Sequence, residues 1–303
     1  MGSAVVNRLQ VTQIDHLSIS APRLRTAVRS IAGLLDALEQ SESEIDQLCH
    51  QLQDCSVIIN AAGMAEPDVS PSDQLFGANA LLPAVIGRAA HRAGADRCVH
   101  ISSQSVQGDL PVLTEDSSVN PFSPYSLSKA LGEQLLLKDD QVASTVVFRA
   151  GSVQGSARKT TQRLVKFAHS PIASVALDTP TTLALIEDTA AAIVFCGAFA
   201  GDIPAVVLQQ GDGLTVREVL SELGARRIRT VPLPVARTLV KAGTALGRWW
   251  PRSAGVARRG RVLWFGQECR ATWLSRSGFH PPVGREGWRA LNSPRHHRDG
   301  VEG

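Results

Sequence analysis

The chain is poor in the residue types that build disulfide frameworks, metal sites and membrane spans. Its 303 residues include five cysteines, two methionines and one tyrosine, and aromatic side chains make up only 5%. The cysteines form no C-x-x-C pair and show no metal-ligand clustering, so we expect neither a disulfide framework nor a bound metal. No apolar run reaches transmembrane length, and no signal-peptide pattern opens the chain. We therefore expect a cytoplasmic protein.

Charge is nearly balanced, with 31 Lys and Arg against 28 Asp and Glu, a formal net charge of +3. Such a balance permits an anionic small-molecule substrate and does not favour nucleic acid as a partner. Hydrophobic residues make up 44% and charged residues 19% of the chain, which is typical of a globular protein with a large core. The length fits one large domain or two smaller ones.

The single tyrosine, Tyr125, precedes Lys129 by four residues in a segment that we predict to be a helix over residues 125–138. Residues four apart lie on the same face of a helix. A phenol has a pKa of about 10 and exchanges protons poorly near neutrality, and a fixed ammonium beside it lowers that pKa. The pair suits proton exchange with a substrate hydroxyl or carbonyl.

Three apolar runs end in small residues, over residues 55–63, 97–108 and 145–155. Each reads as a buried strand that opens into a loop. With helical patterns between them, they predict an α/β fold with a doubly wound parallel sheet, whose functional residues lie at the carboxyl ends of the strands. Ser103 would then meet the substrate oxygen that Tyr125 holds. In the alternative, Ser102 and Ser103 only cap the next helix or turn.

The order strand–Asn-Ala-Ala-Gly, strand–Ser-Ser, Tyr-x-x-x-Lys, strand–Arg-x-Gly resembles the short-chain dehydrogenase/reductase superfamily. Within it the chain is similar to the extended type, the NAD(P)-dependent epimerase/dehydratase group. The resemblance implies a Rossmann domain, a smaller C-terminal substrate-binding domain and a nicotinamide cofactor. It assigns catalysis to Ser103, Tyr125 and Lys129, with Tyr125 as the acid/base and Lys129 holding the nicotinamide ribose.

The cofactor-binding residues that the resemblance implies lie mainly at the strand ends. They are Gly2, Arg23, Arg25, Ala61, Ala62, Gly63, Asn79, Ser102, Tyr125, Lys129, Gly151 and Val153. For Asn79 an equally simple interpretation is a polar group satisfied by its neighbours within a helix, which we predict over residues 72–94.

The dinucleotide fingerprint is incomplete. Residues 2–15 read as the first Rossmann helix, with Gly2 as the third glycine of the fingerprint, and no strand or earlier glycines precede it. These elements normally receive the pyrophosphate. We expect that the natural start lies roughly 10–15 residues upstream, the length of one strand and turn. Loss of normal cofactor binding is the alternative.

The choice of cofactor rests on the end of the second strand, which we predict over residues 16–20. A carboxylate there would bind the adenosine ribose of NAD. None is present near Ser20, and Arg23 and Arg25 follow. Guanidinium groups suit a 2′-phosphate, so NADP is preferred over NAD. Alternatively, both arginines are ordinary solvated side chains.

Substrate binding is assigned to Ser103, Gln104, Ser152 and Arg261. A nucleotide-linked keto sugar is our first choice, although the family often has asparagine where Ser152 stands. A sterol-like or other small ketone is the second choice. Gln104 and Ser105 do not supply the acidic pair of a dehydratase. The basic cluster around Arg261 suits a diphosphate clamp, with a solvated surface or a weak membrane-surface patch as alternatives. A non-catalytic NADP-binding regulator and an inactive fragment remain open.

The predicted domains are a Rossmann domain over residues 1–150, joined again by 182–200, and a mainly substrate-binding domain over 151–291. Residues 292–303 are polar and expected to be frayed. Thr215 and Glu218 have the spacing of a capping box at a helix start. Superfamily habit suggests a homodimer through helices near 72–94 and 125–138, which is analogy alone.

Overall fold

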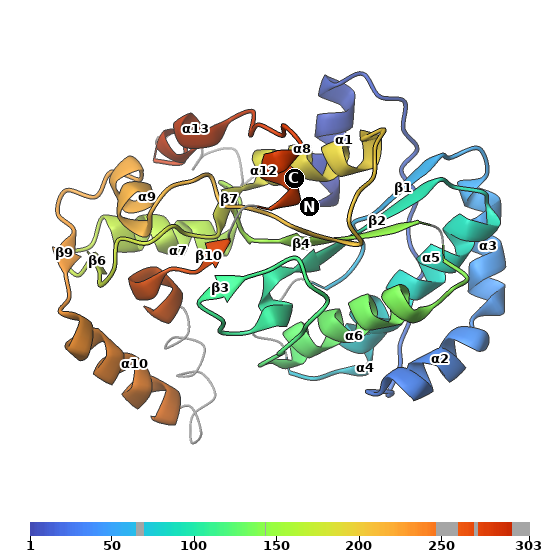
Figure 1. The fold of residues 1–303 in the computed structure, drawn as a ribbon, viewed down its shortest axis with the longest axis horizontal. Coiled ribbons are helices and arrows are strands. Elements are labelled where there is room, and N and C mark those ends of the chain that lie inside the picture. Colours follow the sequence, from blue (N-terminus) through green and yellow to red (C-terminus); the bar gives the residue numbers. More distant parts are fainter. Residues whose placement is uncertain (65–69, 143, 247–259, 270–271, 293–303) are drawn as a thin grey trace, which may run out of the picture.

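A parallel four-stranded sheet forms the centre of the molecule (Figure 1). The computed structural model describes residues 1–64, 70–142, 144–246, 260–269 and 272–292. The strands β1 (Val57–Asn60), β2 (Arg97–Ser103), β4 (Thr145–Ala150) and β8 (Val206–Leu208) pair in the order β1-β2-β4-β8. All three pairings are parallel. The runs that we predicted as buried strands therefore form one sheet, and their carboxyl ends meet at one edge.

Helices cover both faces of the sheet, as Figure 1 shows. On one face α5 (Leu82–Arg92) and α6 (Pro124–Lys138) pack on the strands, with α2 (Ile31–Glu39) against α6 and α3 (Glu42–Leu52) against α5. On the other face, α1 (Gly2–Val11) packs on α8 (Ile186–Ala198), which lies on the sheet. This is the predicted doubly wound α/β fold.

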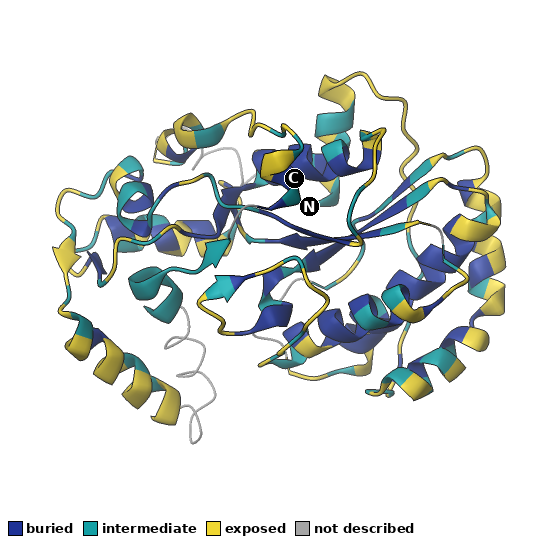
Figure 2. Cartoon of the chain, in the orientation of Figure 1, coloured by how far each residue is buried: buried dark blue, intermediate teal, exposed yellow. Residues whose placement is uncertain are grey.

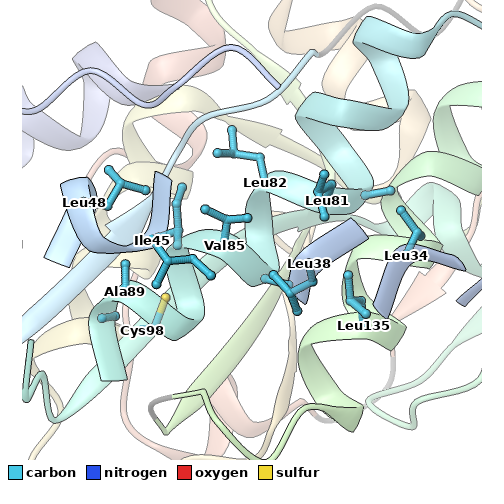
Figure 3. Packing of buried hydrophobic residues seen from close by; sticks show 14 of the residues in the cluster. Leu34, Leu38, Ile45, Leu48, Leu81, Leu82, Val85, Ala89, Cys98 and Leu135 are labelled. Carbon is cyan, nitrogen blue, oxygen red and sulfur yellow. The ribbon is translucent and has the colours of Figure 1, made fainter. Parts of the chain in front are cut away.

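Alternation along β2 divides the core between the two faces. Cys98 belongs to an apolar cluster with α2, α3 and α5, whereas Val99 and Ile101 belong to a second cluster with α1 and α8. Successive side chains of a strand point to opposite faces, which produces this division. Figure 3 shows the first cluster, in which Leu38 and Leu135 come from helices far apart in the sequence.

The helix predicted over residues 72–94 is a nearly continuous run with one irregular turn. It consists of α4 (Asp73–Phe76), a π-helical turn η1 (Gly77–Leu81) and α5, and it ends just before Gly94. Gly77 sits at a tight crossing, where a Cβ would lie 2.1 Å from the carbonyl oxygen of Leu24. A π turn of this kind often marks a functional site.

The strand predicted over residues 16–20 is wrong, because this segment is extended coil. Leu17 is 67% exposed and Ile19 is 39% exposed. In the doubly wound order 3-2-1-4-5-6, a second strand pairs with the first. No strand precedes α1 in the described residues, and β1 is an edge strand of the central sheet.

A third apolar cluster lies beyond the central sheet and includes the fully buried Trp288. Its elements are α7 (Lys159–Ala168), β6 (Ser174–Val175), β7 (Leu183–Leu185), α9 (Val216–Glu222) and α13 (Gly284–Ala290). Thr215 and Glu218 form the predicted capping box at the start of α9. The division of the chain into two domains stays a prediction.

Short elements complete the fold. They are η2 (Gln104–Gln107), β3 (Val112–Leu113), β5 (Ser152–Gln154), β9 (Arg229–Thr230), α10 (Leu233–Leu246), β10 (Glu268–Cys269) and α12 (Trp273–Arg276). Parallel two-stranded pairs join β5 to β7, β6 to β9 and β3 to β10. Figure 2 shows that α10 is largely exposed. No helix in the described ranges is long and apolar enough to cross a membrane. The predicted tail, apart from Asn292, and most of the basic cluster before Arg261 lie outside the described residues.

Candidate active site

Tyr125 stands in the first turn of α6, at the edge of the sheet where β2 ends. Ser123 caps this helix by accepting a hydrogen bond from the backbone N–H of Ser126 at 3.1 Å, and Pro124 occupies the first turn. Ser126 completes a capping box, because its hydroxyl accepts from the N–H of Ser123 at 2.9 Å. These local bonds determine where the helix begins and thereby place the phenol.

Ser103 is both a cap and a partner of Tyr125. Its Oγ accepts hydrogen bonds from the backbone N–H of Ser105 at 3.2 Å and from the Ser105 hydroxyl at 2.9 Å, which caps η2. Its side chain also acts on Tyr125, because it lowers the pKa of the phenol. With both acceptor positions taken by Ser105, the Ser103 hydroxyl proton is the one that remains for the phenol oxygen. The capping and the catalytic interpretations are therefore compatible.

The phenol is perturbed by burial and by a nearby cation. Burial raises the pKa of Tyr125 above its usual value, whereas the hydrogen bond from Ser103 and the charge of Arg158 lower it. Arg158 also lowers the pKa of the Met1 amino group, after the larger effect of burial. Its guanidinium thus lies near both the start of α1 and Tyr125. Sequence reasoning did not select Arg158, and no pattern around it marks it as a site residue.

Lys129 is buried beneath Tyr125 on α6, and its Nζ donates a hydrogen bond to the carbonyl oxygen of Ile101 at 3.0 Å. Burial lowers the pKa of this ammonium to about 8, and Glu133 acts in the opposite direction. Lys129 therefore changes charge close to physiological pH. The prediction that Lys129 lowers the pKa of Tyr125 is wrong for this structure. Burial raises that pKa, and the cation that acts against the rise is Arg158.

Gly63 leaves a space next to Lys129 that no other residue would leave. Its φ is 144°, and a Cβ there would lie 2.8 Å from Asn79 Oδ1 and 3.1 Å from Lys129 Nζ. An L residue rarely adopts such a φ, and the clash adds to that strain. The end of β1 thus presents bare backbone beside a buried ammonium, as the approach of a flat ligand requires.

Asn79 holds the backbone after β1. Its Oδ1 accepts from the N–H of Met64 at 2.9 Å, and its Nδ2 donates to the Met64 carbonyl at 3.0 Å and to Ser128 Oγ at 3.1 Å. It is fully buried. The amide is thus satisfied by the protein, but by residues outside its own helix, and a direct role in cofactor binding stays a prediction.

The other predicted cofactor residues lie partly together. A Cβ on Gly2 would be 3.8 Å from Ala61 Cβ, so the start of α1 adjoins the end of β1. Ala62 donates its N–H to Asn60 Oδ1 at 3.0 Å, and the Ser102 hydroxyl donates to Glu133. Arg23 and Arg25 are exposed in the coil after residue 20. Their roles stay predictions.

A glutamine pair joins the ends of β2, β4 and β8 on the substrate side. Gln209 Oε1 accepts from the N–H of Gly151 at 3.1 Å, and Gln104 Nε2 donates to the Gln209 carbonyl at 2.5 Å. The Oε1 of Gln104 is buried and has no partner among the described residues. Sequence reasoning missed Gln209, which follows an apolar strand run without any motif.

The remaining predicted residues are scattered. Val153 is buried and Ser152 is exposed in β5. Arg261 pairs with Asp109, with Nη1 and Oδ2 3.0 Å apart. Its guanidinium also donates to the Asp109 carbonyl at 2.9 Å, so it is committed to a surface contact.

The sequence matches the model of the NAD dependent epimerase/dehydratase family over residues 1–195. A comparison with curated proteins returns no match. Among solved structures, the Thermus thermophilus UDP-glucose 4-epimerase, in complex with NAD, has a TM-score of 0.56 at 20% identity, covering 99% of this chain and 96% of that one.

Two further structures share the fold. The Bacillus anthracis dTDP-4-dehydrorhamnose reductase, in complex with NADP, has a TM-score of 0.55 at 17% identity, covering 82% and 84% of the two chains. The Bacillus cereus UDP-glucuronic acid 4-epimerase, with UDP-glucuronic acid and NAD, has a TM-score of 0.52 at 19% identity over 76% and 82%. The Ser103–Tyr125–Lys129 arrangement, the Rossmann fold and the family match agree, and the chain belongs to the NAD dependent epimerase/dehydratase family of enzymes.

Proposed function

We propose that this enzyme exchanges hydride between a nicotinamide cofactor and a carbinol or ketone carbon of a nucleotide-linked keto sugar. Tyr125 exchanges the proton with the substrate oxygen, and Ser103 donates a hydrogen bond to the same oxygen. The observation that carries the proposal is the convergence of Ser103, at the end of β2, with Tyr125 and Lys129 on α6, where Lys129 Nζ donates to the carbonyl of Ile101 on β2 and Ser103 lowers the pKa of Tyr125.

The residues at the strand ends suit a nicotinamide cofactor. Gly63 leaves room that a Cβ would fill, and it does so next to the Lys129 ammonium. A bound nicotinamide supplies hydride transfer. Lys129 donates to the ribose hydroxyls, while Gly2, Ala61 and Ala62 provide backbone against the cofactor. Because Lys129 already donates to Ile101, it is held in place before the ligand arrives.

The finer assignments follow the sequence. NADP is preferred over NAD because Arg23 and Arg25 are exposed. The Oε1 of Gln104 is buried and has no partner within the described residues, which suits a hydroxyl donor of a sugar. Substrates that carry a diphosphate are further favoured by Arg158, whose guanidinium acts on Tyr125.

A homodimer through the helices near 72–94 and 125–138 remains a prediction. Within this chain, α2 packs on α6 and α3 packs on α5. All residues of α5 from Leu82 to Ala90 are buried. A dimer interface would therefore have to use the exposed side chains near the start of α6, such as Phe122 and Leu127.

The test combines binding with turnover. Fluorescence titration measures affinity for NADPH and NADH, and NMR follows UDP- and dTDP-linked sugars and their 4-keto forms with catalytic or stoichiometric nicotinamide. We expect binding of NADPH, turnover of at least one sugar, and loss of turnover by about 10²-fold or more in Tyr125→Phe with affinity retained. Absence of binding to either nicotinamide contradicts the proposal. Binding with turnover that Tyr125→Phe leaves unchanged contradicts the role of the tyrosine.

A further inference from the structure

Directly behind the catalytic residues lies a fully buried charged group that the proposed chemistry does not use. Glu133 on α6 is 1% exposed and Arg149 on β4 is 0% exposed, and their Oε2 and Nη2 atoms are 2.8 Å apart. The Arg149 Nε also donates to Glu133 Oε2 at 3.1 Å, so two guanidinium nitrogens reach the same carboxylate. The hydroxyl of Ser102 donates to Glu133 Oε1. Glu133 therefore joins the strands β2 and β4 to the catalytic helix.

The position of Glu133 relates it to Lys129. The two residues are four apart on α6 and lie on the same face, and Ser102 is the neighbour of Ser103. The other charged or titratable groups around Lys129 are Tyr125 on α6, His100 on β2 and Arg149 on β4. His100 is buried with its pKa held well below 6.5, first by burial and then by the charge of Lys129, so it is neutral. Glu133 is the anion among them.

We propose that Glu133 is a positioning residue that keeps Lys129 in its charged, ribose-binding form and holds the end of β2 against the catalytic helix. This inference rests on the function proposed above. Burial alone would deprive Lys129 of its proton, because an ammonium is costly in an apolar surrounding. A carboxylate one helical turn away opposes this effect of burial. The carboxylate oxygens of Glu133 accept hydrogen bonds from Ser102 and Arg149, so the carboxylate is held in one orientation.

Stability alone is a weak reason for burying the Glu133–Arg149 pair. A buried ion pair contributes little stability compared with apolar side chains of similar volume. Arg149 has further partners, because its Nη1 donates to the carbonyl of Asp116 at 2.7 Å and its Nη2 points to that of Ser118 at 3.4 Å. These bonds fix the loop that leads toward Ser123 and the start of α6. The pair thus orders both the lysine and the segment that delivers Tyr125.

The chain offers a matched control at the other end of the same helix. Asp139, the C-cap of α6, is buried and pairs with buried Arg88 at 2.7 Å. Asp139→Asn removes a buried carboxylate from the same helix, as Glu133→Gln does, but ten positions beyond Lys129. Both variants should lower the thermal midpoint. Only Glu133→Gln should change the titration of the active site.

The experiment measures the pH dependence of NADPH affinity and of kcat/KM between about pH 6 and pH 9.5, a window in which lysine but not tyrosine titrates here. The wild type should lose affinity and rate as the pH rises through about 8. In Glu133→Gln this loss should occur at least about one pH unit lower. Asp139→Asn should keep the wild-type midpoint, and Glu133→Asp, which retains the charge, should lie between Gln and wild type.

The outcomes separate the inference from the function beneath it. A wild type without NADPH binding or turnover contradicts the proposed function itself. If the wild type turns over a substrate, and Glu133→Gln and Asp139→Asn have the same pH midpoint, the proposed function stands and the role of Glu133 is overturned. If Glu133→Gln does not fold, the comparison of Glu133→Asp with wild type decides, and an unchanged midpoint overturns the inference.

Discussion

Gly63→Ala is expected to damage both stability and cofactor binding, because the methyl group would enter the space between two functional side chains. Gly63 follows β1 with a φ of 144°, and its Cβ would lie 2.8 Å from Asn79 Oδ1 and 3.1 Å from Lys129 Nζ. Asn79 has little freedom to move aside, because its amide makes three hydrogen bonds to Met64 and Ser128. Lys129 is held by Ile101.

The expected cost has two parts. A positive φ costs an L residue about 1–2 kcal/mol. Overpacking in a well-packed region adds about 1–3 kcal/mol, so that the free energy of unfolding should fall by about 2–5 kcal/mol. Relief of the clash would displace either the Asn79 amide or the Lys129 ammonium. Displacement of the ammonium would remove the charged hydrogen bond that we propose between Lys129 and the cofactor, which is worth about 1.5–3 kcal/mol, or about 10- to 100-fold in affinity.

Gly94→Ala is the matched control. Gly94 also has a positive φ, 78°, but a Cβ there meets nothing within 4 Å. This variant carries the backbone strain without the clash. Chemical denaturation and NADPH titration of both variants measure the difference. If Gly63→Ala is no less stable than Gly94→Ala and binds NADPH equally well, the space beside Lys129 does not have the role assigned to it.

Two further predictions concern charge. Arg158→Gln should weaken NADPH or sugar-nucleotide binding by about 10-fold or more, because it removes the cation near Tyr125, and it should raise the phenol pKa. The control is Arg163→Gln, at an exposed position on the following helix. Equal dissociation constants for the two variants would refute the role of Arg158. Asp212 accepts a hydrogen bond from Trp288 Nε1 at 2.6 Å, and burial raises the pKa of this carboxyl to about 6, with Asp188 adding to the effect. Between about pH 4 and pH 6 the folded protein therefore holds a proton that the unfolded chain has released. The contribution of Asp212 to the free energy of unfolding is complete below about pH 4 and is lost as the pH rises through about 6. Thermal midpoints of wild type and Asp212→Asn should diverge over that window, corresponding to about 1–3 kcal/mol, and parallel curves would contradict the assignment.

Much of the fold could be predicted because its signals are local. The apolar runs at 57–60, 97–103 and 145–150 are buried on both sides of a parallel sheet, and such strands read as continuous hydrophobic stretches. The helix at 124–138 likewise carries its own start signal in Ser123 and Pro124. The segment at 16–20 misled the same reasoning, because a strand also needs a pairing partner that its own residues do not specify.

The sequence by itself determined the fold class, the order of the strand-end loops and the placing of Tyr125 and Lys129 on one helical face, since periodicity and spacing along one element suffice for these. Only the tertiary structure decided the electrostatics. Arg158 acts on Tyr125 from a loop beyond β5, Arg149 meets Glu133 across sixteen residues, and Gln209 reaches Gly151 from another strand. The pKa of a group depends on burial and on charges from every neighbouring element, and these are known only when the chain has folded.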